Sequence, residues 1–120
     1  MPDRINLAEK FSMFSDHWHP RIVAEVNGQQ VKVTKLLGPF DWHHHETEDE
    51  FFLVLAGRLR IEFRDGEVTL GPGECVVVPH GVEHRPFAEV ETQVLLVEPA
   101  STLNTGTERT ARTRENLERI

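Results

Sequence analysis

Three consecutive histidines, His43, His44 and His45, stand a few residues before an apolar segment that begins at Glu50. Neutral imidazole and carboxylate groups are usual nitrogen and oxygen ligands of divalent metals in proteins. Side chains alternate between the two sides of an extended segment, so His43 and His45 point one way and His44 points the other way. The spacing therefore selects His43 and His45 as a pair of candidate metal ligands.

Glu50 is the third candidate ligand. Four residues separate it from His45, which is enough for the chain to reverse, so Glu50 can open the next strand with its side chain directed into the same interior. The acidic residues of the connecting loop are expected to keep that loop solvated, and among them Glu48 stays open as an alternative ligand. A polar surface cluster is the competing interpretation of the three histidines.

The elements that must position these residues are short β-strands, because the apolar pattern from Arg21 onward has a period of two. Segments 50–56 and 58–63 are separated only by Gly57, which predicts a hairpin. Segments 82–87 and 92–97 are expected as two further strands around a short acidic loop. Other turns are expected at Asn27-Gly28, Asp65-Gly66 and 71–73. About eight to ten short strands without interleaved helices predict an all-β sandwich or closed barrel.

The chain is expected to form one domain with three parts. These are an N-terminal helix and arm over 1–19, a β-barrel over 20–100 and a C-terminal arm over 101–120. Residues 5–16 predict a short amphipathic helix with Asn6 as its N-cap. The polar C-terminal arm has few apolar anchors, so it is expected either to fray or to dock as a short helix.

Composition limits the partners. Acidic residues outnumber basic ones by 20 to 13, and the net charge of -7 disfavours binding to nucleic acid or to anionic membranes. The single cysteine, Cys75, rules out an internal disulfide and fits a reducing compartment, and its apolar neighbours predict a buried thiol. No apolar segment approaches the roughly 20 residues that span a bilayer, and a cytoplasmic location is expected.

A second segment, residues 73–84, favours the metal-site interpretation of the histidine cluster over a polar surface cluster. Together the two segments resemble the paired motifs of the cupin family. The first motif matches at Gly38, His43, His45, Glu50 and Gly57, with one residue fewer than usual between Gly38 and His43. The second matches at Gly73, Pro79, Gly81 and His84, whereas Ala88 stands where the family usually has Asn. The resemblance covers roughly residues 20–100.

Similarity to cupins implies a double-stranded β-helix, or jelly roll, flanked here by the short N-terminal helix and the polar C-terminal arm. It implies that His43, His45, Glu50 and His84 converge on one divalent metal ion per chain, which would be Mn, Fe, Ni, Co or Zn. It also implies a small-molecule ligand inside the barrel. Small cupins of this type usually pair through a sheet face, so a homodimer is expected.

The resemblance leaves the activity open, because the same fold and ligand set serve several kinds of protein. The first hypothesis is metal-dependent oxygenase chemistry on a small organic molecule. Isomerisation of a sugar or sugar phosphate is a second, and a non-catalytic module that binds or senses a small molecule or metal is a third. Whether the protein is an enzyme, either a dioxygenase or an isomerase, stays open. No separate general base is evident, and tyrosine is absent.

The residues around the candidate ligands complete the predicted site. Phe52 and Val54 share the parity of Glu50, so they are expected to line the cavity beneath the metal. Phe40 and Trp42 are expected either to cover its mouth or to contact a second subunit. The remaining histidines and the alternating arginines are expected at the surface, and they are His17, His19, His80, Arg58, Arg60 and Arg64.

Overall fold

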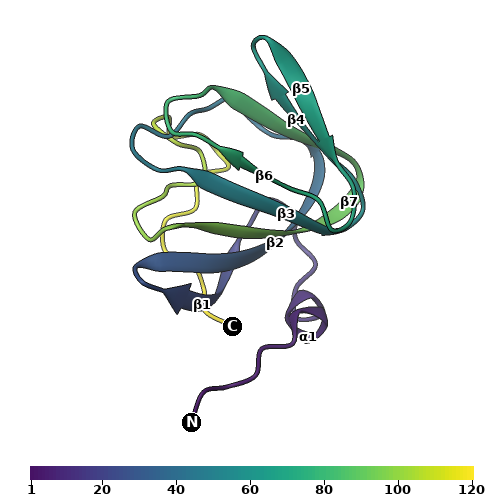
Figure 1. The fold of residues 1–120 in the computed structure, drawn as a ribbon, viewed down its shortest axis with the longest axis vertical. Coiled ribbons are helices and arrows are strands. Elements are labelled where there is room, and N and C mark those ends of the chain that lie inside the picture. The colour runs from purple at the N-terminus through teal and green to yellow at the C-terminus, as the bar shows by residue number, and fades with distance from the viewer.

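A computed structural model describes residues 1–120, and it is an all-β jelly roll with one short helix (Figure 1). Inward and outward side chains alternate along most strands, as the period of two predicted. The helix α1 spans Leu7–Phe11. The strands are β1 (Arg21–Val26), β2 (Gln29–Pro39), β3 (Glu50–Ala56), β4 (Leu59–Phe63), β5 (Gly66–Leu70), β6 (Cys75–Val78) and β7 (His84–Pro99).

The long strand β7 holds the barrel together. One edge of β7 pairs with β2 along most of its length, while the other edge pairs with β4 near its start and with β3 in its second half. The sheet therefore runs β1-β2-β7-β3-β6, and the β4-β5 hairpin folds over from the first part of β7. Figure 1 shows this hairpin at the end of the molecule opposite α1. These strands pair with one another in antiparallel fashion throughout.

The apolar core lies between the two halves of the folded sheet. Val54 and Val94 are fully buried there, as are Leu59 and Ile61 of β4. These residues come from strands far apart in the sequence, and burying each such side chain contributes about 1.5–3 kcal/mol. The core therefore fixes the position of β3 and β7, the two strands that begin at Glu50 and His84.

The prediction of a hairpin at Gly57 is wrong. Strands β3 and β4 do not pair with each other, because β3 pairs with β6 and β7 whereas β4 pairs with β5 and β7. Gly57 instead carries the chain along one edge of β7, from the part of the sheet that contains β3 to the part that contains β4. Its φ is +91°, and an added Cβ would lie 2.8 Å from the Cα of Thr92. Glycine fits here because no other residue tolerates both the angle and the contact.

The two strands predicted over 82–87 and 92–97 are one continuous strand, so the total is seven rather than eight to ten. The expected acidic loop is a bulge within β7, since the pairing with β2 passes directly from Gly38–Ala88 to Leu36–Thr92. The extra residues let β7 bend between the two halves of the sheet. The hairpins predicted at Asn27-Gly28 and Asp65-Gly66 are confirmed.

The terminal segments differ from their predictions in length and shape. Helix α1 is shorter than the predicted 5–16, although Asn6 is its N-cap and accepts a hydrogen bond from the Glu9 backbone at 3.2 Å. The C-terminal segment contains no helix, and it docks through turns and irregular structure. Its last residue donates a backbone hydrogen bond to Ile22, and Thr107 donates one to His44. None of the helices has the length and apolar character needed to cross a membrane.

Cys75 is exposed rather than buried. It opens β6, which pairs on one side only, with β3, and its side chain lies on the outer face of the sheet. The apolar neighbours that predicted burial alternate with it, and Val78 is the buried member of that strand.

Candidate metal centre

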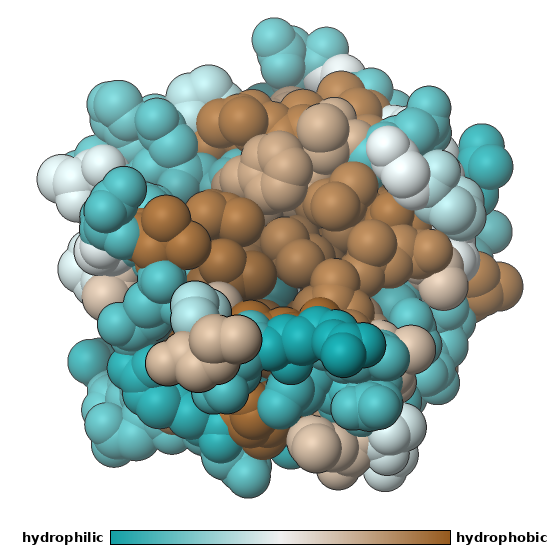
Figure 2. All heavy atoms as spheres, turned by 60° about the horizontal axis from the view of Figure 1, so that its bottom comes forward, coloured by the Kyte–Doolittle hydropathy of each residue, from teal (hydrophilic) through white to brown (hydrophobic).

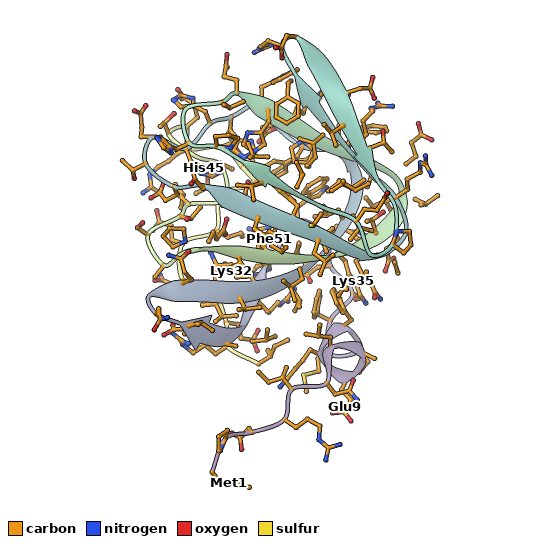
Figure 3. The ribbon with its side chains drawn as sticks, in the orientation of Figure 1. Met1, Glu9, Lys32, Lys35, His45 and Phe51 are labelled. Carbon is orange, nitrogen blue, oxygen red and sulfur yellow. The ribbon has the colours of Figure 1, made fainter.

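The structure brings together all four residues that the motifs selected. Ligand atoms of His43, His45, Glu50 and His84 lie within 4.8 Å of one another, and all four side chains are buried. Glu50 and His84 are the first residues of β3 and β7, while His43 and His45 lie in the segment that leads into β3. Figure 3 shows His45 on this segment, well away from α1.

Backbone hydrogen bonds fix the segments that carry the histidines. His43 and His84 exchange two backbone hydrogen bonds of 3.0 and 2.9 Å, which form an isolated bridge. The backbone N–H of Gly81 donates to the carbonyl of His45 at 2.7 Å, which ties the turn before β7 to the histidine segment. The local structure thus joins the two sequence motifs before any side-chain interaction is considered.

The rings of His43 and His84 are held in one orientation. Their Nδ1 atoms lie 2.8 Å from the carbonyl of Asp41 and 2.9 Å from the carbonyl of Val82. A carbonyl oxygen only accepts, so each Nδ1 carries the hydrogen and each Nε2 keeps a free lone pair. This arrangement is the usual support for a metal-binding imidazole.

His45 and Glu50 complete the group. Both ring nitrogens of His45 are buried without a hydrogen-bond partner, and its Nε2 lies 3.5 Å from the Glu50 carboxyl, which also lies 3.3 Å from Nε2 of His84. A buried imidazole without partners is costly unless another group satisfies it. Three nitrogens and one carboxylate oxygen suit a divalent metal ion, so these residues fit such a cofactor.

Electrostatics favour the protonation states that a metal needs. Burial, together with the nearby His84, lowers the pKa of His43 to about 4, so this ring is neutral at pH 7. Burial opposes ionisation of Glu50, but the imidazole rings of His45 and His84 close to its carboxyl outweigh burial and hold the pKa of that carboxyl well below its usual range. The site therefore combines a neutral imidazole with a charged carboxylate.

A cavity of about 40 Å³ adjoins the group and reaches His43 and Glu50. Phe52 lines it as predicted, whereas Val54 lies deeper in the core and does not. Phe40 packs edge-on against His43 and stacks on Trp18, with ring centroids 5.4 and 4.7 Å apart, so this aromatic pair covers one side of the cavity.

Trp42 lies outside the cavity, where the guanidinium of Arg64 sits 3.8 Å from its ring centroid. The neighbouring acids also point away from the site. Glu48 accepts a hydrogen bond from Ser101, and Asp49 accepts two from His80. The alternative ligand Glu48 is thus engaged elsewhere.

The remaining histidines have partners at the surface. The ring of His44 pairs with Glu46 at 3.0 Å, and those of His17 and His19 pair with Glu91 and Asp16. Arg64 forms an exposed ion pair with Glu83, as the outward orientation predicted, and the half-buried Arg60 pairs with Glu62.

Sequence reasoning missed a buried polar group in the same barrel. Lys32 on β2 forms an ion pair with Glu98 on β7, and Thr34 and Glu98 line the cavity. Burial and the negative charge of Glu50 raise the pKa of the Glu98 carboxyl well above its usual range. Lys32 lies between Val31 and Val33, and this local pattern carries no signal for a buried pair with Glu98.

The jelly roll and the buried group of three histidines and one glutamate define a β-barrel protein with a site able to hold a metal. The chain belongs to the cupin family, because the family model described as Cupin domain matches residues 37–98, more than half of the chain.

Relatives support this assignment. A cupin-2 domain containing protein from Shewanella frigidimarina NCIMB 400 has a crystal structure that matches with a TM-score of 0.78 and 48% identity, covering 79% of this chain and 93% of that one. The uncharacterized protein YdbB of Bacillus subtilis (strain 168) is 40% identical over 77 residues, 63% of this chain and 68% of its own length. An acireductone dioxygenase of Bacillus licheniformis is 31% identical over an alignment of 80 residues, and the match covers 62% of this chain and 45% of that enzyme. The chain thus spans less than half the length of that dioxygenase.

Proposed function

We propose that this cupin holds one divalent metal ion per chain through His43, His45, Glu50 and His84, with Mn, Fe, Ni, Co or Zn as candidates. The observation that carries the proposal is the buried ring of His45, whose two nitrogens have no partner beside the Glu50 carboxyl. A metal ion would satisfy one of these nitrogens and the carboxyl together.

We further propose that the site performs oxygenase-type chemistry on a small organic molecule. A metal ion bound by these four residues would supply Lewis-acid chemistry, because it could orient and polarise a small chelating molecule. Residues of the chain orient the ligands and shape the cavity. Backbone carbonyls fix the rings of His43 and His84, and Phe40 and Phe52 keep the adjoining cavity apolar. Partial identity to acireductone dioxygenase supports this proposal.

The cavity favours the oxygenase proposal over isomerisation of a sugar phosphate. No lysine or arginine lines it, so a phosphate group would find no cationic partner there. A non-catalytic module that binds a small molecule is the other candidate, and it would use the same ligands and the same cavity.

Two measurements test these proposals. Elemental analysis of protein purified without a His-tag or chelating column is expected to find a metal that the His45→Ala, His84→Ala double variant lacks. The matched control is His44→Ala, because its ring is half-buried, pairs with Glu46 and lies outside the group. Absence of metal from wild-type protein refolded with each candidate ion would overturn the metal proposal.

Oxygen uptake then separates the candidate activities. The metal-loaded protein is expected to consume oxygen with at least one member of a panel of diketones, thiols and phenols. No oxygen uptake with any member of the panel, combined with ligand-induced thermal stabilisation, would favour the binding module instead.

We also propose that the protein is a cytoplasmic homodimer without nucleic-acid or membrane partners. Apolar side chains on the outer face of β3 and β7, including Leu53 and Leu95, are only half-buried, and Val77 on β6 is 53% exposed. Figure 2 shows apolar side chains gathered into one broad area of the surface. Such an area favours a protein partner, and a second copy would cover it. Light scattering at micromolar concentration measures the mass of wild type and of Leu53→Glu. A monomeric mass for both proteins would refute the dimer.

A further inference from the structure

A second cavity, which we name the tail cavity, lies between β1, β2 and the C-terminal segment. Its volume is about 250 Å³, against about 40 Å³ for the cavity beside the candidate metal centre. Its wall includes Ile22 and Lys32 on the two strands and Thr102, Asn116 and Leu117 on the C-terminal segment. Figure 1 shows this segment ending beside β1. No residue lines both cavities, so the two are distinct sites.

The buried ion pair between Lys32 and Glu98 stands between the two cavities. Lys32 lines the tail cavity and Glu98 lines the cavity beside the metal centre, and neither residue lines both. The Lys32 ammonium lies 2.7 Å from one carboxyl oxygen of Glu98, and that carboxyl also forms a hydrogen bond with Glu50. Figure 3 shows Lys32 on the sheet below the histidine segment. Glu98 therefore belongs to the metal side of the barrel, and Lys32 is the buried cation of the tail cavity.

Two buried groups in the wall of the tail cavity have hydrogen-bonding capacity that the protein does not use. The Lys32 side chain is 2% exposed, and its ammonium donates one hydrogen bond, to Glu98, so two of its three N–H groups remain. The hydroxyl of Thr102 is buried without a partner, in a residue that is 9% exposed. Buried donors that stay unpaired are costly. A hydrogen-bond acceptor inside the tail cavity would satisfy both groups.

The charges of the wall favour a neutral acceptor over an anion. Glu98 already balances Lys32, and at the mouth Glu115 and Arg119 each form an ion pair with an exposed neighbour. A carboxylate in the cavity would add an unbalanced negative charge close to Glu98. A carbonyl oxygen brings two lone pairs without a charge, so it can accept from Lys32 and from Thr102 together.

The rest of the wall suits a compact apolar body with an amide end. Ile22, Ala100 and Leu117 are its apolar residues. The Gln30 side chain donates through its amide nitrogen to Glu25 at 3.3 Å, which leaves its carbonyl oxygen free to accept an N–H from a ligand. Asn116, at the mouth, is exposed, so the cavity is open to solvent.

We propose that the tail cavity binds a small neutral carboxamide, whose carbonyl oxygen accepts hydrogen bonds from Lys32 and Thr102 while its N–H donates to Gln30. The apolar remainder of the ligand packs between Ile22 and Leu117. This site is separate from the proposed metal centre and does not need a metal ion. Its test therefore uses metal-free protein, and the metal proposal can fail without affecting it.

The test compares two probes of nearly equal size and shape, benzamide and benzoate, which differ in charge. Each is titrated at pH 7 and constant ionic strength into isotope-labelled metal-free protein, and NMR chemical shifts report both the affinity and the location of binding. Thr102→Val replaces a buried hydroxyl with a methyl group. Thr34→Val is the matched control, because the hydroxyl of Thr34 is also buried without a partner but lines the other cavity.

The double variant Lys32→Met, Glu98→Leu removes the cationic donor without leaving an unpaired buried charge. Thermal denaturation establishes that each variant is folded before the titrations. This variant removes the Lys32 contact, and Thr102→Val removes the other contact to the carbonyl oxygen, so the two test the two halves of the proposed interaction separately.

Benzamide is expected to bind the wild type at millimolar concentration, about tenfold or more tightly than benzoate, with the largest shift changes at Thr102 and Asn116. Thr102→Val and the double variant should each weaken benzamide binding by about tenfold, and Thr34→Val should stay within about twofold of wild type. Benzoate binding as tightly as benzamide would overturn the proposal. Unchanged affinity in Thr102→Val or in the double variant, shift changes centred on the histidine segment, or no binding of benzamide at millimolar concentration would also overturn it.

Discussion

Removing Lys32 alone should destabilise the protein far more than removing both members of its ion pair. In the wild type the Lys32 ammonium lies 2.7 Å from the Glu98 carboxyl, and both side chains are 2% exposed. Lys32→Met therefore leaves the Glu98 carboxyl buried without its cation. Breaking a buried pair in this way costs about 3–5 kcal/mol. A domain of this size loses roughly 4 °C in Tm per kcal/mol, so the midpoint should fall by about 12–20 °C.

The double variant Lys32→Met, Glu98→Leu removes both charges and keeps similar volumes. Its free energy of unfolding should return to within about 1 kcal/mol of wild type, or exceed it. The matched surface control is Arg119→Met, because Arg119 pairs with Glu25 while 63% and 45% of their side chains are exposed. That change should cost less than about 1 kcal/mol.

Urea denaturation of the metal-free proteins at pH 7, followed by circular dichroism, measures all four free energies under one condition. A cost below about 1 kcal/mol for Lys32→Met would refute the reasoning, since it would mean that Glu98 has another partner. A double variant as unstable as the single one would also refute it, because the loss would then come from packing rather than from an unpaired buried charge.

Two further predictions concern His43 and Gly57. The pKa of His43 is about 4 in the folded protein and 6.5 when unfolded, so below pH 6.5 the unfolded chain binds the extra proton and stability falls. Urea denaturation of metal-free protein should show a loss of about 3 kcal/mol between pH 7 and pH 4 from this residue, and an identical loss in His43→Asn would contradict it. Gly57→Ala should lower the free energy of unfolding by roughly 3 kcal/mol or more, because the added Cβ would meet Thr92. The control Gly28→Ala should cost about 1 kcal/mol, because the space around Gly28 is open. Equal midpoints of the two variants in thermal denaturation would contradict this prediction.

The four candidate ligands were predictable because their signals are local. Alternation separates His44 from His43 and His45, and the turn at Gly81 fixes where His84 begins the last strand. The paired motifs supplied His84 only through the resemblance to cupins. Local signals thus selected His43, His45 and Glu50, the resemblance added His84, and the structure brings all four together inside the barrel.

The features that were missed depend on contacts between distant segments. Gly57 has the composition of a hairpin turn, but its close approach to Thr92 makes it a crossover. The acidic bulge of β7 has the composition of a loop, and only its pairing with β2 shows that the strand continues. Lys32 faces inward because Glu98, sixty-six residues later, offers it a partner. No local pattern contains that information.

The central claim is that His45 and its three neighbours hold a metal, and metal content tests it most directly. Elemental analysis of untagged wild-type protein and of His44→Ala should find about one metal ion per chain, with His45→Ala close to zero. Equal metal in His45→Ala and wild type would contradict the account, because the buried ring of His45 would then have no role in binding.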